Sequence, residues 1–197
     1  DRVASIVEHP DATAEELEIN EINTSIYCFR RNLLAPALRR LSPENAQGEY
    51  YLTDAVAVLR SAGHKVIALS AEDAAEAIMV NDRAQLAEAE TELRARINRR
   101  WMRDGVTMVD PARTYVDATV EIDPDVRILP GTILEGRTSI GQGSVIGPDC
   151  HLVDAIVGER TTITNAVVRD AEIGDECSVG PYAYVRPGTR LATGVKV

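Results

Sequence analysis

Residues 116–150 read VDATVEIDPDVRILPGTILEGRTSIGQGSVIGPDC, and a branched aliphatic residue returns at every sixth position of this run. In nearly every unit a small or β-branched residue follows four positions later, and Gly, Pro or Asp stands at a turn. No helix or ordinary strand has such a period. It is the hexapeptide signature of a left-handed parallel β-helix, in which three flat faces make one coil and stacked coils share a core. The aliphatic positions are Val116, Ile122, Ile128, Leu134, Ile140 and Ile146.

The repeat continues to the end of the chain with two changes of phase. After residue 150 the spacing shortens and later returns to six, so that the aliphatic positions are Leu152, Val157, Ile163, Val168, Ile173, Val179, Val185 and Leu191. The chain stops within a repeat, without the terminal cap that a solenoid requires, and it begins without Met. We therefore expect an internal segment of a longer protein, in which 105–197 form the N-terminal part of a β-helix domain.

Residues 1–81 alternate between strand-like and helix-like patterns. Such alternation is typical of an α/β layer. It predicts the C-terminal part of a larger, doubly wound Rossmann-like domain. Strands are predicted at 3–7, within 18–29 and at 66–69, and helices over 33–41 and 49–62, the second ended by Gly63.

Residues 82–104 are predicted to form one long helix between these two parts. Asp82 can cap its start, Gln85 can complete a capping box, and Gly105 can close its end. Glutamates precede arginines along it, the order that complements the helix dipole. We interpret it as a spacer rather than a site, with a narrow apolar stripe of Leu86, Leu93, Ile97 and Trp101.

Composition excludes several classes of function. The formal charge of −10 argues against a nucleic-acid or anionic-membrane surface. No apolar run approaches the roughly 18 residues of a membrane helix, and no signal-peptide pattern opens the chain, so we expect a cytoplasmic protein.

The 3 cysteines, an odd number, fit reduced thiols better than a disulfide framework. Cys150 and Cys177 take the small-residue position of the repeat and are predicted to be core residues. A zinc site at Cys150 and His151 is not expected, because neighbouring strand residues point to opposite faces.

Four strings carry a resemblance to a known family: IVEH at 6–9, EINT at 21–24, NAQGEYYLTD at 45–54 and VNDR at 80–83. In this order, and followed by a hexapeptide β-helix, they resemble the bifunctional N-acetylglucosamine-1-phosphate uridylyltransferase/glucosamine-1-phosphate N-acetyltransferases. The resemblance covers essentially the whole chain.

The resemblance implies two reactions. The first transfers an acetyl group from acetyl-CoA to glucosamine-1-phosphate, and the second transfers a uridylyl group from UTP to N-acetylglucosamine-1-phosphate with Mg²⁺. The product, UDP-N-acetylglucosamine, serves peptidoglycan and lipopolysaccharide synthesis. The resemblance also implies a homotrimer whose partners are small molecules (sugar phosphates, UTP and acetyl-CoA), without a nucleic-acid or membrane partner.

Site residues follow from the same strings. Glu8 and Asn23 are expected to hold the N-acetylglucosamine moiety, because a carboxylate accepts hydrogen bonds from hydroxyls and an amide both donates and accepts. Asn81 is expected at the magnesium and nucleotide-phosphate site, since Mg²⁺ prefers oxygen ligands. The resemblance places three further residues around the sugar, although capping and packing of a predicted helix also explain them: Glu49, Tyr51 and Thr53.

Arg186, in the string VRPG at 185–188, is expected to bind the phosphate of the acetyl acceptor through its guanidinium fork. The alternative is an arginine at a solvated corner, as at Arg127, Arg137, Arg160 and Arg190. Ser25 stands where the family usually has Gly. The resemblance places the glycine-rich nucleotide loop before Asp1 and the acetyl-transfer histidine after Val197. We therefore expect no catalytic residue in this chain and no activity from it alone.

Two other functions remain open. One is a related sugar-1-phosphate nucleotidylyltransferase that uses its β-helix for assembly. The other is a trimeric scaffold without catalysis.

Overall fold

The computed structural model describes residues 3–197. The chain divides into two compact units, an N-terminal unit that ends at Met79 and a solenoid unit from Val80 to Val197. The division predicted from the sequence, into 1–81, 82–104 and 105–197, stays a prediction. Each unit is described by itself.

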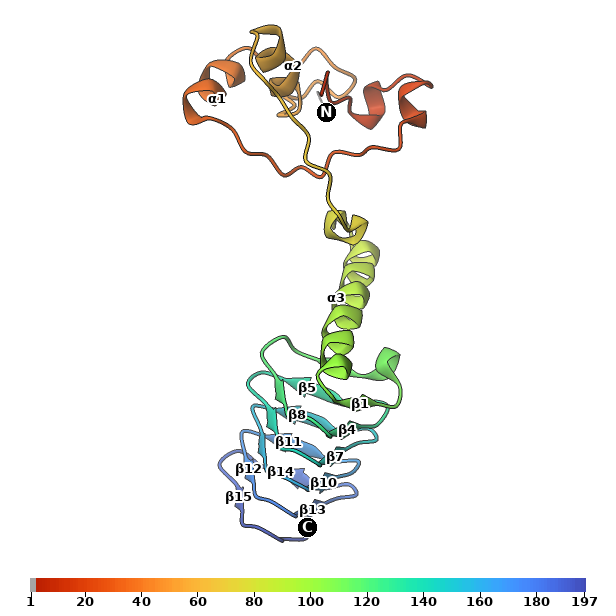
Figure 1. Cartoon of the computed structure of the whole chain (residues 1–197), viewed down its shortest axis with the longest axis vertical. Coiled ribbons are helices and arrows are strands. Elements are labelled where there is room, and N and C mark those ends of the chain that lie inside the picture. The colour runs from red at the N-terminus through yellow and green to blue at the C-terminus, as the bar shows by residue number, and fades with distance from the viewer. Residues whose placement is uncertain (1–2) are drawn as a thin grey trace. The chain divides into compact units, whose positions relative to one another are not determined.

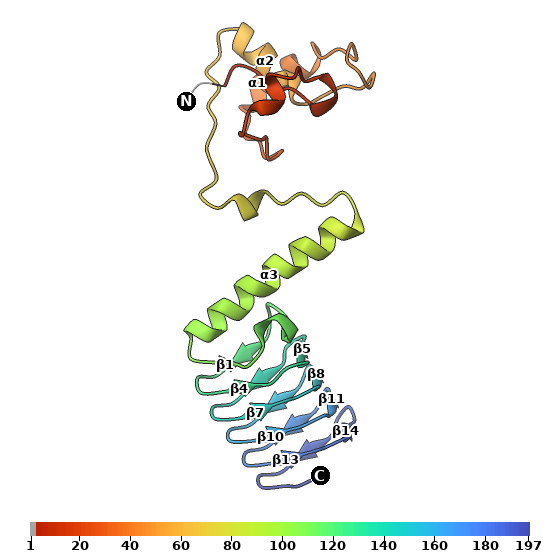
Figure 2. The same cartoon turned by 90° about the vertical axis from the view of Figure 1, so that its right-hand side faces the viewer.

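The solenoid unit contains a left-handed parallel β-helix, as the six-residue period predicts (Figures 1 and 2). Its strands form three parallel five-stranded sheets: the β1 sheet (β1-β4-β7-β10-β13), the β2 sheet (β2-β5-β8-β11-β14) and the β3 sheet (β3-β6-β9-β12-β15). The strand bounds are β1 Thr107–Met108, β2 Tyr115–Val116, β3 Glu121–Ile122, β4 Arg127–Ile128, β5 Ile133–Glu135, β6 Ser139–Ile140, β7 Val145–Ile146, β8 His151–Val153, β9 Ile156–Val157, β10 Thr162–Ile163, β11 Val167–Arg169, β12 Glu172–Ile173, β13 Ser178–Val179, β14 Tyr184–Val185 and β15 Arg190–Leu191.

The core of the β-helix is a stack of aliphatic side chains from successive coils. Ile128 pairs in register with Ile146, and Ile146 with Ile163, and all three side chains are 0% exposed. Each such residue contributes roughly 1.5–3 kcal/mol through its burial. Cys150 and Cys177 are buried in the same core, which confirms their predicted place.

The changes of phase are shortened corners. Leu134 pairs with Leu152, 18 positions later, whereas Leu152 pairs with Val168, 16 positions later. At the shortened corners Asp154 and Asn165 adopt φ values of 49° and 43°. Asp and Asn tolerate this left-handed conformation better than most residues. The stack therefore keeps its register although the sequence spacing changes.

Helix α3 (Arg83–Arg103) precedes the first coil. Asp82 caps it by accepting a hydrogen bond from the Gln85 N–H at 2.8 Å, as predicted. The Gln85 side chain accepts from the N–H of Asn81 at 2.7 Å, one residue earlier than a capping box requires. Gly105 follows the helix with a φ of 97°, which closes it as expected.

The C-terminal half of α3 packs on the β-helix. Asn98 is 1% exposed, and its Nδ2 donates to the carbonyl oxygens of Pro111 and Thr114, both at 2.9 Å. The 3₁₀ helix η4 (Pro111–Arg113) forms part of this contact region. Of the predicted apolar stripe, Ile97 and Trp101 pack against the core, whereas Leu86 and Leu93 are exposed.

The N-terminal unit contains α1 (Arg31–Leu38), α2 (Asp54–Ser61) and the 3₁₀ helices η1 (His9–Asp11), η2 (Glu16–Glu18) and η3 (Ala74–Ala77). Its small core is centred on Ala37, Ala55 and Leu59. The helix predicted over 33–41 is therefore present. The second helix begins at Asp54 rather than Glu49, because the Asn45 side chain accepts a hydrogen bond from the Glu49 N–H at 3.1 Å and holds this segment in a turn.

The strands predicted at 3–7, within 18–29 and at 66–69 are wrong. The described residues of this unit contain no strand, apart from an isolated bridge at Ile67. A strand requires a hydrogen-bonded neighbour, and these segments do not pair with one another. The Rossmann-like sheet is therefore not present in the described residues. None of the described helices has the length and apolar character that crossing a membrane requires.

Candidate functional site

Two of the expected sugar-binding residues meet in the N-terminal unit. Glu8 lies just before η1, and Thr53 lies just before α2. Thr53 Oγ1 donates a hydrogen bond to Glu8 Oε1 at 2.8 Å, and Thr53 is 6% exposed. Glu8 Oε2 accepts no hydrogen bond from residues 3–197. One carboxylate oxygen is thus held in place while the other can accept from a ligand.

Asp11 belongs to the same region, and the sequence reasoning missed it. Its Oδ1 accepts a hydrogen bond from the Ala46 N–H at 2.7 Å, which ties η1 to the loop before α2. The signal in the sequence was an acid just after the IVEH string, but nothing local indicated that it would reach residue 46. It is the fold that brings this carboxylate to the loop that carries Glu49 and Tyr51.

Tyr51 is a hydrogen-bond donor in this region. Burial, then the nearby Asp11 carboxylate, raise the pKa of the Tyr51 hydroxyl, and Glu49 and Glu8 act in the same direction. The hydroxyl therefore stays protonated at neutral pH, and it donates to Gln47 Oε1 at 3.0 Å. Glu49 itself is exposed.

The electrostatics of this region select among ligands. Carboxylates of Glu8, Asp11 and Glu49 lie close enough to Tyr51 to act on its pKa. Such a group accepts hydrogen bonds from hydroxyls and repels a bare phosphate. The arrangement therefore suits a ligand that presents hydroxyl groups better than one that presents a bare phosphate.

Asn23 makes its own local contacts. Its Nδ2 donates to the Tyr27 hydroxyl at 2.6 Å, and its Oδ1 accepts from the Ser25 N–H at 3.3 Å. Ser25 has a φ of 58°, the left-handed conformation that explains a preference for Gly there. No hydrogen bond among the described residues joins Asn23 to Glu8, so the structure does not bring these two together through direct contact.

Asn81 and Arg186 lie in the solenoid unit. Asn81 is exposed and begins the turn into α3, and its side-chain oxygen accepts no hydrogen bond from the described residues. Arg186 is exposed just after β14 and forms no ion pair with residues 3–197. It differs in this from Arg160, which pairs with Glu159 and Glu176, and from Arg190, which pairs with Glu172.

A protein-built metal centre does not emerge from the described residues, because they contain no group of 3 or more His, Cys, Asp or Glu side chains that could hold an ion. Asn81 offers one amide oxygen, a kind of ligand that Mg²⁺ accepts.

Comparison with known proteins gives a consistent relationship along the whole chain. The bifunctional protein GlmU of Heliobacterium modesticaldum is 48% identical over 195 residues, which cover 99% of this chain and 43% of that protein. The protein of the same name from Desulfitobacterium hafniense is 48% identical over 197 residues, covering 100% and 44%. That of Halalkalibacterium halodurans is 44% identical over 195 residues, covering 99% and 43%. The chain thus spans less than half of the length of these relatives.

No family model matches the chain. Among solved structures, a similar one is an alanine mutant of a GDP-perosamine N-acetyl transferase from Caulobacter crescentus, in complex with CoA and GDP-perosamine. It is 21% identical, with a TM-score of 0.38, and the match covers 54% of this chain and 61% of that one.

Proposed function

From the premise that this chain is related over its whole length to bifunctional GlmU proteins, we propose that the intact protein makes UDP-N-acetylglucosamine in two steps. It transfers an acetyl group from acetyl-CoA to glucosamine-1-phosphate, and it then transfers a uridylyl group from UTP to N-acetylglucosamine-1-phosphate. The observation that carries this proposal is sequence similarity to bifunctional proteins along both units, and not along the β-helix alone. The product would serve cell-wall synthesis in the cytoplasm.

In the uridylyl step the residues of the N-terminal unit hold the sugar. The nucleophile is a phosphate oxygen that is already anionic, so catalysis depends on position more than on a base. Glu8 would accept from sugar hydroxyls through Oε2, while Thr53 orients its other oxygen. Tyr51, Glu49 and Asn23 would complete the contacts with the sugar.

Asn81 would supply an amide oxygen to Mg²⁺ near the nucleotide phosphates. Its exposed, unengaged side-chain oxygen fits a single-ligand role. When bound, Mg²⁺ supplies charge neutralisation for the phosphates. The remaining ligands would be a carboxylate that the resemblance places before Asp1, phosphate oxygens, and water, which Mg²⁺ commonly keeps.

In the acetyl step Arg186 would bind the phosphate of the amino-sugar acceptor. Its guanidinium is exposed and without an ion-pair partner among the described residues. A guanidinium fork can make two parallel hydrogen bonds to a phosphate. No residue of this chain is assigned as the base that takes the amine proton.

A homotrimer is supported by the outer face of the β2 sheet. The residues that pair in register along this face are largely apolar or aromatic: Tyr115, Ile133, His151, Val167 and Tyr184. The corresponding residues of the β3 sheet are mostly polar or charged: Glu121, Ser139, Ile156, Glu172 and Arg190. A partly exposed apolar strip of this kind indicates an interaction surface. We assign it to other copies of this chain.

The proposal is tested on the full-length protein with glucosamine-1-phosphate, acetyl-CoA, UTP and Mg²⁺. Release of CoA thiol and formation of UDP-N-acetylglucosamine, followed by chromatography, are the expected results. Nucleotidyl transfer without CoA release would favour the related nucleotidylyltransferase. A folded oligomer with neither activity would favour the scaffold.

A further inference from the structure

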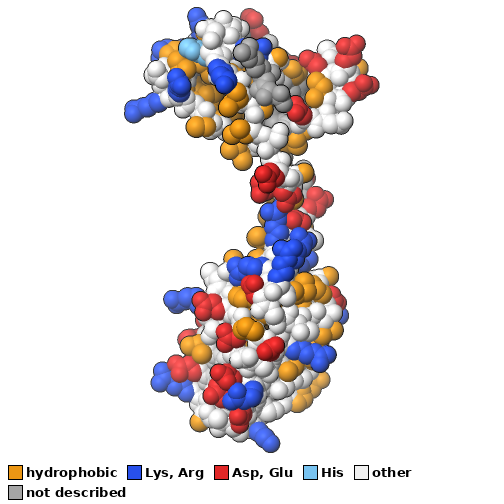
Figure 3. All heavy atoms as spheres, viewed as in Figure 1, with side chains coloured by type: hydrophobic (Ala, Val, Ile, Leu, Met, Phe, Trp, Pro, Cys, Tyr) orange, Lys and Arg blue, Asp and Glu red, His pale blue; other side chains and the backbone are white. Residues whose placement is uncertain are grey.

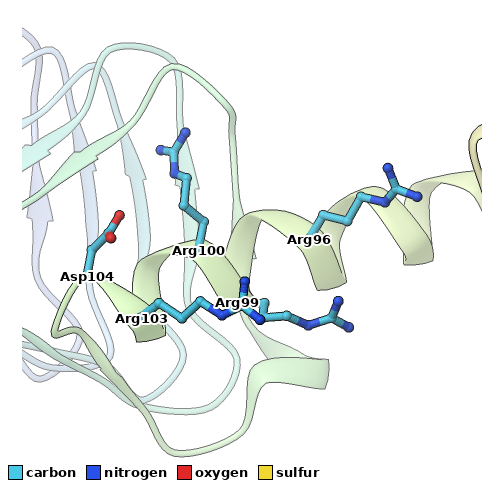
Figure 4. Close-up of a pocket in the computed structure, with 5 residues that line it drawn as sticks. All are labelled: Arg96, Arg99, Arg100, Arg103 and Asp104. Carbon is cyan, nitrogen blue, oxygen red and sulfur yellow. The ribbon is translucent and has the colours of Figure 1, made fainter. Parts of the chain in front are cut away.

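The C-terminal half of α3 carries a pocket whose walls are basic. It has a volume of about 250 Å³ and is lined by Arg96, Arg99, Arg100, Arg103 and Asp104 (Figure 4). With 3.6 residues per turn, the four arginines share an arc of about 100° on the helix. Figure 3 shows Lys and Arg side chains gathered over this part of the solenoid unit, in a chain whose formal charge is −10.

Helix capping does not explain these arginines. Two of the last carbonyl groups of α3 are satisfied by the backbone, because the Asp104 N–H donates to the Arg100 carbonyl and the Val106 N–H to the Trp101 carbonyl, both at 3.0 Å. The helix dipole favours cations here, but it amounts to only about half a charge. Arginines three and four positions apart repel one another.

Internal ion pairs leave positive charge in excess. Arg96 binds Glu92 at 2.8 Å, and Asp104 offsets one further charge at the wall of the pocket. Arg99 and Arg103 form no ion pair with residues 3–197. About two positive charges therefore remain without internal compensation, which favours binding of a multiply charged anion.

We propose that this pocket binds a small, multiply charged phosphate compound of the size of inorganic pyrophosphate. Guanidinium groups recognise phosphate oxygens through parallel hydrogen bonds, and four arginines line this pocket. The volume is below the roughly 300–1,000 Å³ of pockets for larger organic ligands, so a whole nucleotide is not the expected occupant. The site is distinct from the residues assigned to either reaction, and the inference does not depend on the proposed function.

Trp101 provides a reporter for occupancy. It is the 1 tryptophan of the chain, and the Arg100 guanidinium carbon lies 4.5 Å from its ring centroid. An anion that draws Arg100 into hydrogen bonds changes this cation–π contact. Binding is therefore measurable as a change in Trp101 fluorescence, without any assay of activity.

The test titrates the 197-residue chain with inorganic pyrophosphate and, separately, with orthophosphate, following fluorescence and the heat of binding. A saturable signal at one ligand per chain is expected, stronger for pyrophosphate. The double variant R99Q/R103Q should weaken binding by about tenfold or more, because it removes two guanidinium forks. The matched control R94Q/R137Q removes the same charge outside the pocket, since Arg94 lies over Tyr115, and should keep the affinity.

Absence of a saturable signal would overturn the proposal. So would equal weakening in the two double variants, because that result indicates a general effect of charge. Should R99Q/R103Q fail to fold, as judged by circular dichroism, the pair R99K/R103K decides. This variant keeps the charge but loses the planar guanidinium groups that make two parallel hydrogen bonds to a phosphate. We expect it to bind several-fold more weakly than the parent chain. An affinity equal to that of the parent would contradict the arginine-specific site.

Discussion

Thr53 donates a hydrogen bond from Oγ1 to Glu8 Oε1 at 2.8 Å, although the two residues stand 45 positions apart in the chain. The bond orients the carboxylate of Glu8 and leaves its second oxygen available. Because Thr53 is buried and sits at the start of α2, the position of this carboxylate is tied to the small core of the N-terminal unit.

Replacing Glu8 tests the sugar-binding assignment. In the full-length protein, Glu8→Ala should lower kcat/KM for uridylyl transfer by about 10- to 100-fold, the loss expected for hydrogen bonds to a charged group worth roughly 1.5–3 kcal/mol. Acetyl transfer measured on the same preparation should be unchanged. Glu15→Ala, at an exposed acid outside the site, is the control. Equal loss of both activities in Glu8→Ala would show a folding effect instead.

Two isoleucines on neighbouring coils test the aliphatic stack. Ile146 is 0% exposed and points into the core, whereas Ile156 is 54% exposed on the outer face of the β3 sheet. Ile146→Ala should lower the free energy of unfolding by about 2–5 kcal/mol through lost burial and a cavity. Ile156→Ala should lower it by less than about 1 kcal/mol. Urea unfolding followed by circular dichroism measures both, and similar losses would argue against the inward and outward alternation.

Asn98 tests how α3 is attached to the first coil. Asn98→Ala removes the donor to the Pro111 and Thr114 carbonyls. We expect a loss of about 1–3 kcal/mol in the free energy of unfolding, because buried carbonyl groups are left without partners. Hydrogen exchange of residues 83–103 should also become faster. The same measurements on Glu90→Ala, an exposed position of the helix, should show little change.

The outer face of the β2 sheet tests the trimer. Val167 lies on this face between His151 and Tyr184, and Val167→Glu would place a charge in the proposed contact between copies. Sedimentation equilibrium at micromolar concentration should show a trimer for the parent chain and smaller species for this variant. Thr162→Glu, on the β1 sheet, should remain trimeric. A monomeric parent chain would contradict the assembly.

The cysteines test burial through their reactivity. Burial raises the pKa of the Cys150 thiol, so it stays protonated where an ordinary thiol begins to ionise, and the thiolate is the reactive form. Cys177 is also buried, whereas Cys28 is exposed. A thiol reagent should therefore label 1 of the 3 cysteines quickly in the folded chain and all 3 in urea. Fast labelling of Cys150 at about pH 8 would contradict the packed core.

Elements whose formation depends on residues close together in the chain could be predicted well from the sequence. The β-helix follows from the period because each unit repeats the same inward aliphatic residue, and α3 follows from the cap at Asp82 and the closing Gly105. Local patterns could not show whether the strands expected at 3–7 and 66–69 would form. A strand forms only if another strand accepts its hydrogen bonds, and no local pattern contains that information.

For the candidate site, too, the sequence predicted some features and left others to the tertiary structure. The strings pointed to Glu8, Tyr51 and Thr53 as separate residues, and the sequence alone offered capping and packing as equal explanations for the last two. The hydrogen bond between Thr53 and Glu8, and that between Ala46 and Asp11, exist only because η1 and the loop before α2 lie together. Asn23, in contrast, satisfies its amide locally.

By itself the sequence determined the coil of the β-helix, the cysteines in its core and the limits of the helix that precedes it, because each depends on residues that are near in the chain. The tertiary structure decided which of the remaining segments pair, which carboxylate oxygen stays available, and that four arginines of one helix share a single pocket. These depend on distances between side chains, which periodicity and composition do not contain.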